Sequence, residues 1–194
     1  MVRPREFDRD EALERATRVF WAKGYASTST EDLLLAMNIG RQSLYNAFGD
    51  KRKLYLEALE QYQQTSTASH LERLNSSASP LAGIEALLLG LIADDDEVRA
   101  LGCMGVGAVC EFGATDAELV ALRKWVGPVL SKRLADRIRE GQACGEIDAS
   151  IDTQETAAFV QMTMQGLQLG ARAGGDAEGL RSMAKFAINR LRKT

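Results

Sequence analysis

Cysteine and histidine are scarce in this chain of 194 residues, which has three cysteines and a single histidine, His70. The cysteines form no CxxC pair and match no histidine at metal-ligand spacing, so we expect no metal site. One histidine also leaves no Ser/His/Asp set, and neither a phosphate-binding glycine loop nor paired acids stand at a credible site. These absences predict a protein that is not an enzyme and that holds no cofactor.

Proline, strand patterns and long apolar runs are missing as well. Only three prolines occur, and no stretch alternates apolar and polar residues with the period of two that marks a strand, which predicts an all-α fold. No segment is long and apolar enough to cross a membrane and none reads as a signal peptide, so we expect a cytoplasmic protein. The acidic run from Asp94 to Asp96 lacks the spacing of a calcium loop and predicts a helix cap.

The charge of the chain is distributed unevenly. The net charge is −3, with ten basic and eight acidic residues over 1–55, and fourteen basic and nineteen acidic residues over 56–194. A mildly basic N-terminal part on an acidic remainder argues against indiscriminate nucleic-acid binding. It suits a protein that docks on DNA in one orientation.

Two amphipathic helices are predicted near the N-terminus. Between Asp8 and Gly24 the apolar residues recur with helical spacing, and they are Ala12, Leu13, Ala16, Val19 and Phe20. Gly24 is a natural C-terminal stop. A second helix is predicted to begin with a capping box formed by the Thr28 hydroxyl and the Glu31 carboxylate. Its buried side is expected to contain Leu33, Leu34, Ala36 and Met37.

A third helix of about eight residues follows the turn Asn38-Ile39-Gly40, and it is too short to be stable alone. Leu44 and Phe48 are four residues apart and are expected to face a core. The polar side chains left over are Arg41, Gln42, Ser43, Tyr45 and Asn46. Polar side chains at the start of a short, supported helix are typical of the recognition helix of a helix-turn-helix unit.

Residues 7–62 resemble the DNA-binding domain of the TetR family of bacterial transcriptional regulators. The resemblance is carried by Ala16-x-x-x-Phe20, Gly24-Tyr25, Thr28-Ser29, the run from Ile39 to Lys51, and Leu54. Two departures from the family pattern are Gly40, where serine is frequent, and Asn46-Ala47, where aromatic residues or histidine are common. The operator sequence therefore cannot be transferred from a relative.

The resemblance implies DNA-binding roles residue by residue. Phosphate contacts are implied for Thr28, Ser29, Tyr45 and Lys51, major-groove contacts for Arg41, Gln42 and Ser43, and a base or backbone contact for Asn46. The Arg41 side chain is suited to hydrogen-bond the O6 and N7 atoms of guanine, and the Gln42 amide is suited to hydrogen-bond the N6 and N7 atoms of adenine. Lys51 begins the fourth helix, whose N-terminus also favours a phosphate.

The remainder of the chain is predicted to be helical. A long helix over 50–74 joins an N-terminal DNA-binding domain, residues 1–50, to a helical body, residues 51–194. Further helices are expected over 81–93, 116–144 and 153–173, with a short one after the acidic run and a last one along the apolar stripe from Leu180 to Leu191. Pro80 is expected in the first turn of the helix over 81–93, and Pro128 is expected to kink the helix over 116–144.

The segment from Gly102 to Gly113 is apolar and rich in small residues. Three of its glycines, Gly102, Gly105 and Gly107, each weaken a helix by about 1 kcal/mol relative to alanine, so either close helix packing or a ligand cavity must compensate. The residues predicted to line such a cavity are Met104, Phe112, Trp125 and Gln165. Glu111 is expected either to anchor a ligand or to bind a helix end, and the sequence does not decide between these roles.

The family resemblance also implies a mechanism. A homodimer places two recognition helices about 34 Å apart on a near-palindromic operator. The dimer interface is expected to be formed by the helices over 116–144 and 153–173. An effector inside each body changes the separation of the recognition helices. We therefore expect a homodimeric repressor that a small, apolar molecule releases from double-stranded operator DNA.

A cysteine-based sensor of electrophiles or oxidants is the alternative. Cys103 and Cys110 lie seven residues apart, which on one helix is about 10.5 Å along its axis and beyond the reach of a disulfide. An adduct at Cys103, or a bridge between subunits, stays open. Against this stands the interpretation of Cys103 as a small buried hydrophobic residue.

Overall fold

The computed structural model describes residues 7–193, without the side chains of Trp125 and Val126. Over this part of the chain the secondary structure is helical, and the only β-type pairing is an isolated bridge between Ile147 and Arg192. The helices are α1 (Arg9–Lys23), α2 (Thr30–Met37), α3 (Arg41–Phe48), α4 (Lys51–Leu74), α5 (Pro80–Leu89), α6 (Asp96–Ala100), α7 (Met104–Phe112), α8 (Ala117–Cys144), α9 (Thr153–Arg172) and α10 (Ala177–Asn189). The all-α prediction is confirmed. No helix in the described part of the chain combines the length and the hydrophobicity that a membrane crossing requires.

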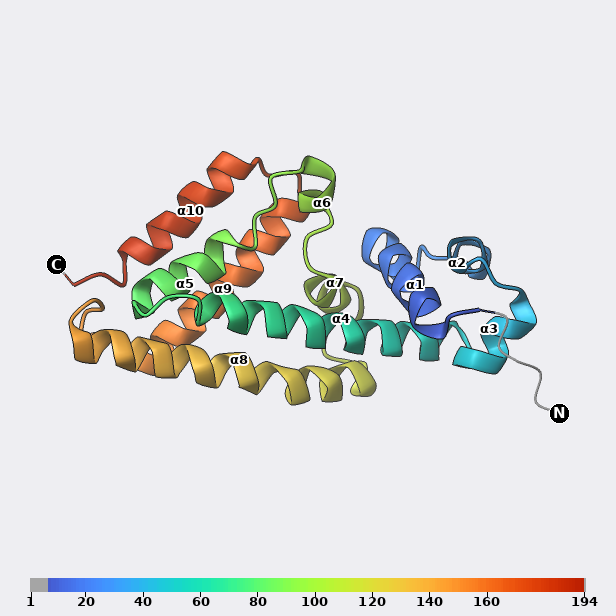
Figure 1. The fold of residues 1–194 in the computed structure, drawn as a ribbon, viewed down its shortest axis with the longest axis horizontal. Coiled ribbons are helices and arrows are strands. Elements are labelled where there is room, and N and C mark those ends of the chain that lie inside the picture. Colours follow the sequence, from blue (N-terminus) through green and yellow to red (C-terminus); the bar gives the residue numbers. More distant parts are fainter. Residues whose placement is uncertain (1–6, 194) are drawn as a thin grey trace.

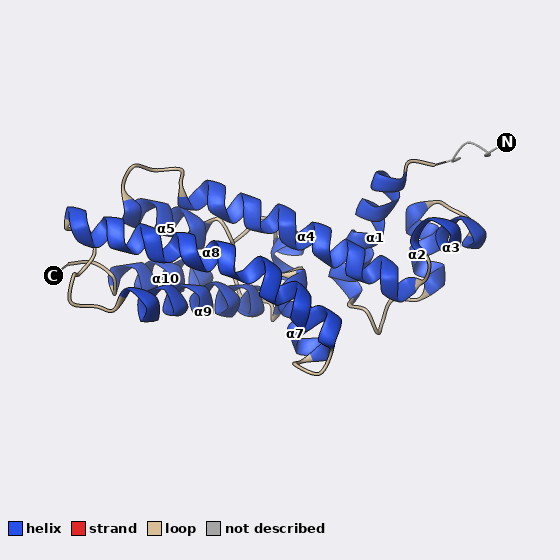
Figure 2. Ribbon diagram, turned by 90° about the horizontal axis from the view of Figure 1, so that it is seen from below, coloured by secondary structure: helices blue, strands red, loops and turns tan. Residues whose placement is uncertain are grey.

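The helices form two groups at opposite ends of the long helix α4 (Figure 1). We call α1, α2 and α3, with the N-terminal half of α4, the head, and α5 to α10 with the rest of α4 the body. Figure 2 shows α8 running alongside α4, while α9 and α10 lie below them in that view. Helix α7 packs against α1, α4 and α9, and so stands between head and body.

Two hydrophobic clusters stabilise these groups. The body cluster extends from Leu74 on α4 to Leu191 and fills the space between α5, α8, α9 and α10. The head cluster contains the buried faces of α1, α2 and α3 and the α4 residues Leu54, Tyr55, Ala58 and Leu59. It also contains Met104, Ala108 and Leu119, which belong to α7 and α8. The head therefore completes its core with residues of the body.

Most predicted helix ends are confirmed by their caps. The side chains of Asp8, Ser79, Asp95 and Asp116 accept hydrogen bonds from the first turns of α1, α5, α6 and α8, and Pro80 occupies the first turn of α5. The prediction for α5 was wrong at its C-terminus, because the helix ends at Leu89 rather than at residue 93. Gly90 is the C-cap, and a Cβ atom there would lie 2.4 Å from Cδ of Arg73, so a larger residue requires the Arg73 side chain to move. Helix α8 continues across Pro128.

Candidate nucleic-acid interface and ligand cavities

The short helix α3 is held in place from behind. Leu44 and Phe48 are 1% and 5% exposed and anchor it in the head cluster. Arg9 of α1 stands over the Phe48 ring, 4.4 Å from its centroid, donates to the carbonyl of Ala47 at 3.3 Å and forms an ion pair with Glu57 of α4 at 2.5 Å. This tertiary support explains how eight residues remain helical.

The opposite side of α3 displays polar side chains to solvent. Arg41, Gln42, Tyr45 and Asn46 are exposed, and Ser43 is partly exposed. The Gln42 amide Nε2 donates to Oδ1 of Asn46 at 3.0 Å, one turn further along the helix. Arg41 forms a surface ion pair with Glu31 of α2, which is worth at most about 1 kcal/mol and is readily exchanged for another partner. Gly40 is the N-cap, as predicted, and leaves the start of the helix free of a covering side chain.

The capping box of α2 was predicted one residue too early. Ser29, not Thr28, is the N-cap, and it exchanges hydrogen bonds with Asp32 at 3.0 and 2.9 Å. Thr28 is 1% exposed and its hydroxyl donates to the carbonyl of Gly24 at 2.6 Å, which removes that hydroxyl from the surface. A hydrogen bond from Lys23, together with those from Ser29, lowers the pKa of Asp32 to about 2. Of the two expected phosphate ligands at this end, only Ser29 is exposed.

Lys51 is the first residue of α4, as predicted. Its ammonium group lies over the ring of Tyr25, 4.3 Å from the centroid. The N-cap Asp50 accepts from the backbone N–H of Lys53 at 2.8 Å. Lys51 thus stands where the head meets solvent, next to a helix N-terminus.

Glu111 joins the body to the head. Its carboxylate, on α7, accepts the backbone N–H groups of Tyr25 and Ala26 at 2.9 and 2.5 Å, in the turn between α1 and α2. Charge-assisted hydrogen bonds of this kind are stronger than neutral ones. Of the two roles that the sequence left open for Glu111, the structure shows the second, a bond to backbone at the end of a helix.

Arg172 makes a second connection that the sequence did not predict. From α9 it donates to the carbonyls of Trp21 at 3.0 Å and Ala22 at 3.1 Å, at the C-terminal end of α1, where a cation is favoured. The Trp21 indole in turn donates to the carbonyl of Gly102 at 3.1 Å. The partners in these contacts are some 80 to 150 positions apart in the chain, so no local sequence pattern predicts the contacts.

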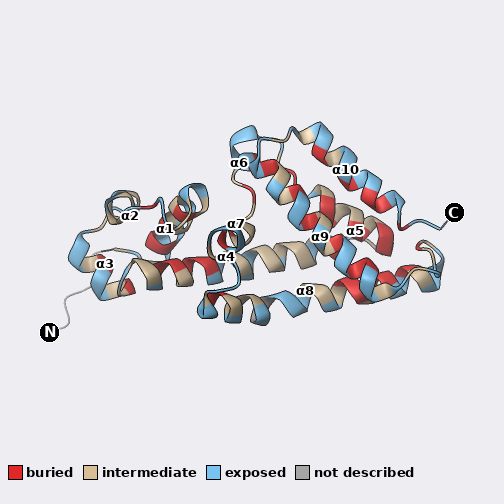
Figure 3. Cartoon of the chain, turned by 180° about the vertical axis from the view of Figure 1, so that it is seen from behind, coloured by how far each residue is buried: buried red, intermediate tan, exposed pale blue. Residues whose placement is uncertain are grey.

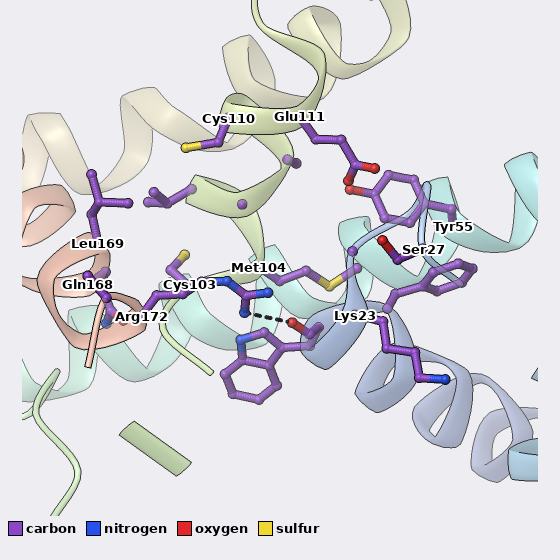
Figure 4. Close-up of a pocket in the computed structure, with 17 residues that line it drawn as sticks. Lys23, Ser27, Tyr55, Cys103, Met104, Cys110, Glu111, Gln168, Leu169 and Arg172 are labelled. Carbon is purple, nitrogen blue, oxygen red and sulfur yellow. Dashed lines mark hydrogen bonds between the residues drawn. The ribbon is translucent and has the colours of Figure 1, made fainter. Parts of the chain in front are cut away.

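The connection between head and body encloses a cavity of about 500 Å³, which we call the junction cavity (Figure 4). Its walls come from α1, α4, α7 and α9 and include Trp21, Tyr55, Cys103, Glu111 and Arg172. Gly102, at its edge, has a positive φ of 60°, and a Cβ atom there would lie 2.8 Å from the carbonyl oxygen of Gln168. At this position the explanation for glycine is close packing.

A larger cavity of about 960 Å³ lies within the body, between α4, α7, α8 and α9, and we call it the body cavity. Gly105 and Gly127 are in its wall, and a Cβ atom on Gly127 would meet nothing within 4 Å. Here small residues leave room. His70 also lines the cavity, and burial, reinforced by the charge of Arg73, lowers its pKa to about 4, so it is neutral at pH 7.

The four predicted cavity residues have different positions. Gln165 lines the body cavity, whereas Met104 is 4% exposed and lines the junction cavity from the head cluster. Phe112 is not among the residues that line either cavity, because its ring packs 5.5 Å from that of Tyr25 and 5.8 Å from that of Tyr55. The Trp125 side chain lies outside the described residues.

The three cysteines are free thiols in different surroundings. Cys110 and Cys144 are exposed, whereas Cys103 is half-buried at the N-cap of α7 and lines both cavities. Tyr62 also lines the body cavity, and burial raises the pKa of its phenol.

Comparison with known proteins decides the family. Residues 12–58 match the model described as bacterial regulatory proteins of the tetR family, and residues 81–187 match the tetracyclin repressor-like C-terminal domain. The chain belongs to the TetR family. The recognition made from the helix-turn-helix motifs is confirmed, and the second match extends it through the body.

Transcriptional regulators that are similar over most of this chain are known. The HTH-type transcriptional repressor ComR of Escherichia coli is 29% identical over 94% of this chain and 88% of its own. The transcriptional regulator AcuR of Cereibacter sphaeroides is 30% identical over 77% of this chain and 69% of its own. A cysteine mutant of the TetR-family regulator CifR, complexed with a 26-bp double-strand operator DNA, is 32% identical with a TM-score of 0.80, covering 97% of this chain and 99% of that one.

Family membership establishes the broad activity. The chain is a DNA-binding transcriptional regulator of the TetR family with a helix-turn-helix head, and not an enzyme. The corresponding expectations from the sequence are confirmed.

Proposed function

We propose that this TetR-family regulator is a homodimeric repressor, released from its operator by a small molecule that enters the body cavity. The observation that carries the proposal is the free polar face of α3, which is supported by Arg9, Leu44 and Phe48 and covered by nothing in the described chain. ComR, a relative over most of the chain, is named a repressor.

Contacts with DNA are assigned from exposure and chemistry. Arg41 and Gln42, with Asn46 behind Gln42, read base edges in the major groove, and Ser43 lies beside them. Ser29, Tyr45 and Lys51 contact phosphates and fix the register, because the N-cap of α2 and the start of α4 both present exposed N–H groups. Thr28 is left out of the set, since its hydroxyl is occupied by Gly24.

We assign the dimer interface to α9 and α10, which keeps the predicted helix over 153–173, now α9, and puts α10 in place of the predicted helix over 116–144. The outer sides of α9 and α10 are exposed along most of their length (Figure 3). The large apolar side chains exposed there are Phe159, Met162 and Leu169 on α9 and Met183 and Phe186 on α10. The residues of each set lie on one face of their helix. Gly166 lies between Met162 and Leu169, and a Cβ atom there would meet nothing within 4 Å, so this part of the α9 face is also open. Among the described side chains of α8, Val129 is the only large apolar one that is exposed to a similar extent.

Coupling between effector and DNA runs through shared helices. Helix α7 lines the body cavity with Val106 and Val109 and holds the head through Glu111, while α9 lines it with Gln165 and holds the head through Arg172. A ligand that prefers one arrangement of α7 and α9 therefore also selects one position of the head. It lowers operator affinity by its differential binding free energy.

Footprinting on the protein's own promoter region tests this function. Wild-type protein is expected to protect a roughly palindromic site, and Arg41→Ala to bind it about ten- to a hundred-fold more weakly, because a guanine contact is lost. Binding should weaken steeply between two salt concentrations through the phosphate contacts. Arg15→Ala, which removes an arginine from an exposed side of α1, is the matched control. Equal protection by wild type and Arg41→Ala would refute the assignment of α3.

Covalent sensing through Cys103 is the second candidate. Its supporting observation is that this half-buried thiol lines both cavities, so a reactive compound in either one meets it. In that case N-ethylmaleimide is expected to release wild type and Cys110→Ser from operator DNA, but not Cys103→Ser, in a gel-shift titration. Release of Cys103→Ser to the same extent excludes the cysteine mechanism.

A further inference from the structure

The body cavity is lined by cations and amides. The cations are Arg123, Lys132 and Arg139, and the amides are Gln63, Gln154, Gln161, Gln165 and Gln168. None of the described residues that line the cavity is aspartate or glutamate. This contrasts with residues 56–194 as a whole, where acidic residues outnumber basic ones. The electrostatic character of the cavity is therefore opposite to that of the body around it.

Of these three cations, Arg123 has a buried side-chain nitrogen without a hydrogen-bond acceptor in the described chain. Its Nη2 donates to the carbonyl of Gly113 at 2.9 Å, but Nη1 is buried and has no acceptor among the described residues. By contrast, Arg139 is paired with Asp136 at 2.5 Å, and Lys132 is exposed. A buried guanidinium N–H without an acceptor is costly, and an anionic ligand oxygen removes that cost.

The rest of the wall is apolar and roomy. Val106, Leu130 and Met164 come from α7, α8 and α9, and Gly127 leaves open space beside Leu130. Gln63 of α4 also lines the cavity, and its side-chain carbonyl oxygen is buried without a hydrogen-bond partner among the described residues. A ligand that satisfies this cavity has an apolar part and one compact anionic end.

We propose that the effector is a small organic acid whose carboxylate binds Arg123 and whose apolar part packs against Val106, Leu130 and Met164. The word effector rests on the proposed function, whereas binding of the acid to Arg123 does not. The inference replaces the small, apolar effector expected from the sequence with an acid that has an apolar part. The Nη1 atom carries two N–H donors, and a carboxylate oxygen is a suitable acceptor for them.

Two matched pairs of probes test the inference by calorimetry on the full chain without DNA. Hexanoate is compared with hexanamide, and benzoate with benzamide, since each pair differs in charge but little in shape. At least one acid is expected to bind about tenfold more tightly than its amide. Arg123→Gln should abolish that preference by weakening binding of the acid, and Arg123→Lys should restore part of it. Arg15→Gln, which removes an exposed cation outside the cavity, should behave as wild type.

The outcomes separate this inference from the proposed function. Equal or tighter binding of the amides, no binding of either acid at millimolar concentration, or an unchanged preference in Arg123→Gln would overturn it. Because the assay contains no DNA, a failure to bind operator leaves the result intact. If an acid binds through Arg123 but does not release operator DNA, the cavity chemistry stands and the effector role fails.

Discussion

Replacing Met162 with arginine is expected to convert the dimer into monomers and to weaken operator binding by at least about a hundredfold. Met162 is 71% exposed on α9, so the folded monomer accommodates a charged side chain there. In a dimer built on α9 and α10 the same residue is buried against a second copy, where an unpaired charge is costly. The loss of DNA affinity follows because two linked heads bind with avidity that a single head lacks.

Light scattering and operator-binding anisotropy, on one preparation, measure both effects. Val98→Arg is the matched control, since Val98 is 51% exposed on α6 and outside the α9–α10 face. It should stay dimeric and bind DNA as wild type does. The circular dichroism of Met162→Arg should keep its helical amplitude. A variant that remains dimeric would place the interface elsewhere, with the exposed side of α8 as the next candidate.

Phe20→Ala is expected to lower the free energy of unfolding by about 3–5 kcal/mol, the range for removing a fully buried aromatic side chain. Phe20 is 1% exposed, and its ring meets that of Tyr55 edge-on at 5.0 Å between centroids. Urea titration measures the loss of unfolding free energy. The protein concentration must be the same for all variants, because dimerisation contributes to the apparent stability.

The matched control for Phe20→Ala is Leu35→Ala. Leu35 is 85% exposed on α2, so its truncation should change the unfolding free energy by no more than about 0.5 kcal/mol. Both variants should unfold in one transition, because the head cluster includes Met104 and Ala108 of the body. A loss below about 1 kcal/mol in Phe20→Ala, or a separate early transition of the head, would contradict this description.

Local signals in the sequence were sufficient to predict the helices. The stripe from Ala12 to Phe20, the proline at position 80 and the aspartate caps depend on neighbours within one or two turns, and the structure confirms them. The capping box of α2 was ambiguous for a local reason. Both Thr28 and Ser29 are followed three residues later by an acid, and only the carbonyl of Gly24, which accepts the Thr28 hydroxyl, decides between them.

The cavities could not be predicted in the same way. Periodicity shows that Met104 and Phe112 are apolar positions of a helix, but it does not show which of them faces a core and which faces empty space. That depends on how α7 packs against α1 and α4, which are distant in sequence. For the same reason the contacts of Arg172 with α1, and the unpaired N–H of Arg123, left no signal in the sequence.

The head cluster has a consequence for engineering. A chimeric regulator joins the DNA-binding domain of one protein to the effector domain of another. In this chain, a graft that ends at residue 59 would leave Phe20 and Tyr55 facing whatever a foreign body supplies in place of Met104, Ala108 and Leu119. A working transplant must therefore carry residues 104–119 with it, because two separate family models match the head and the body but the packing of the head includes residues of the body.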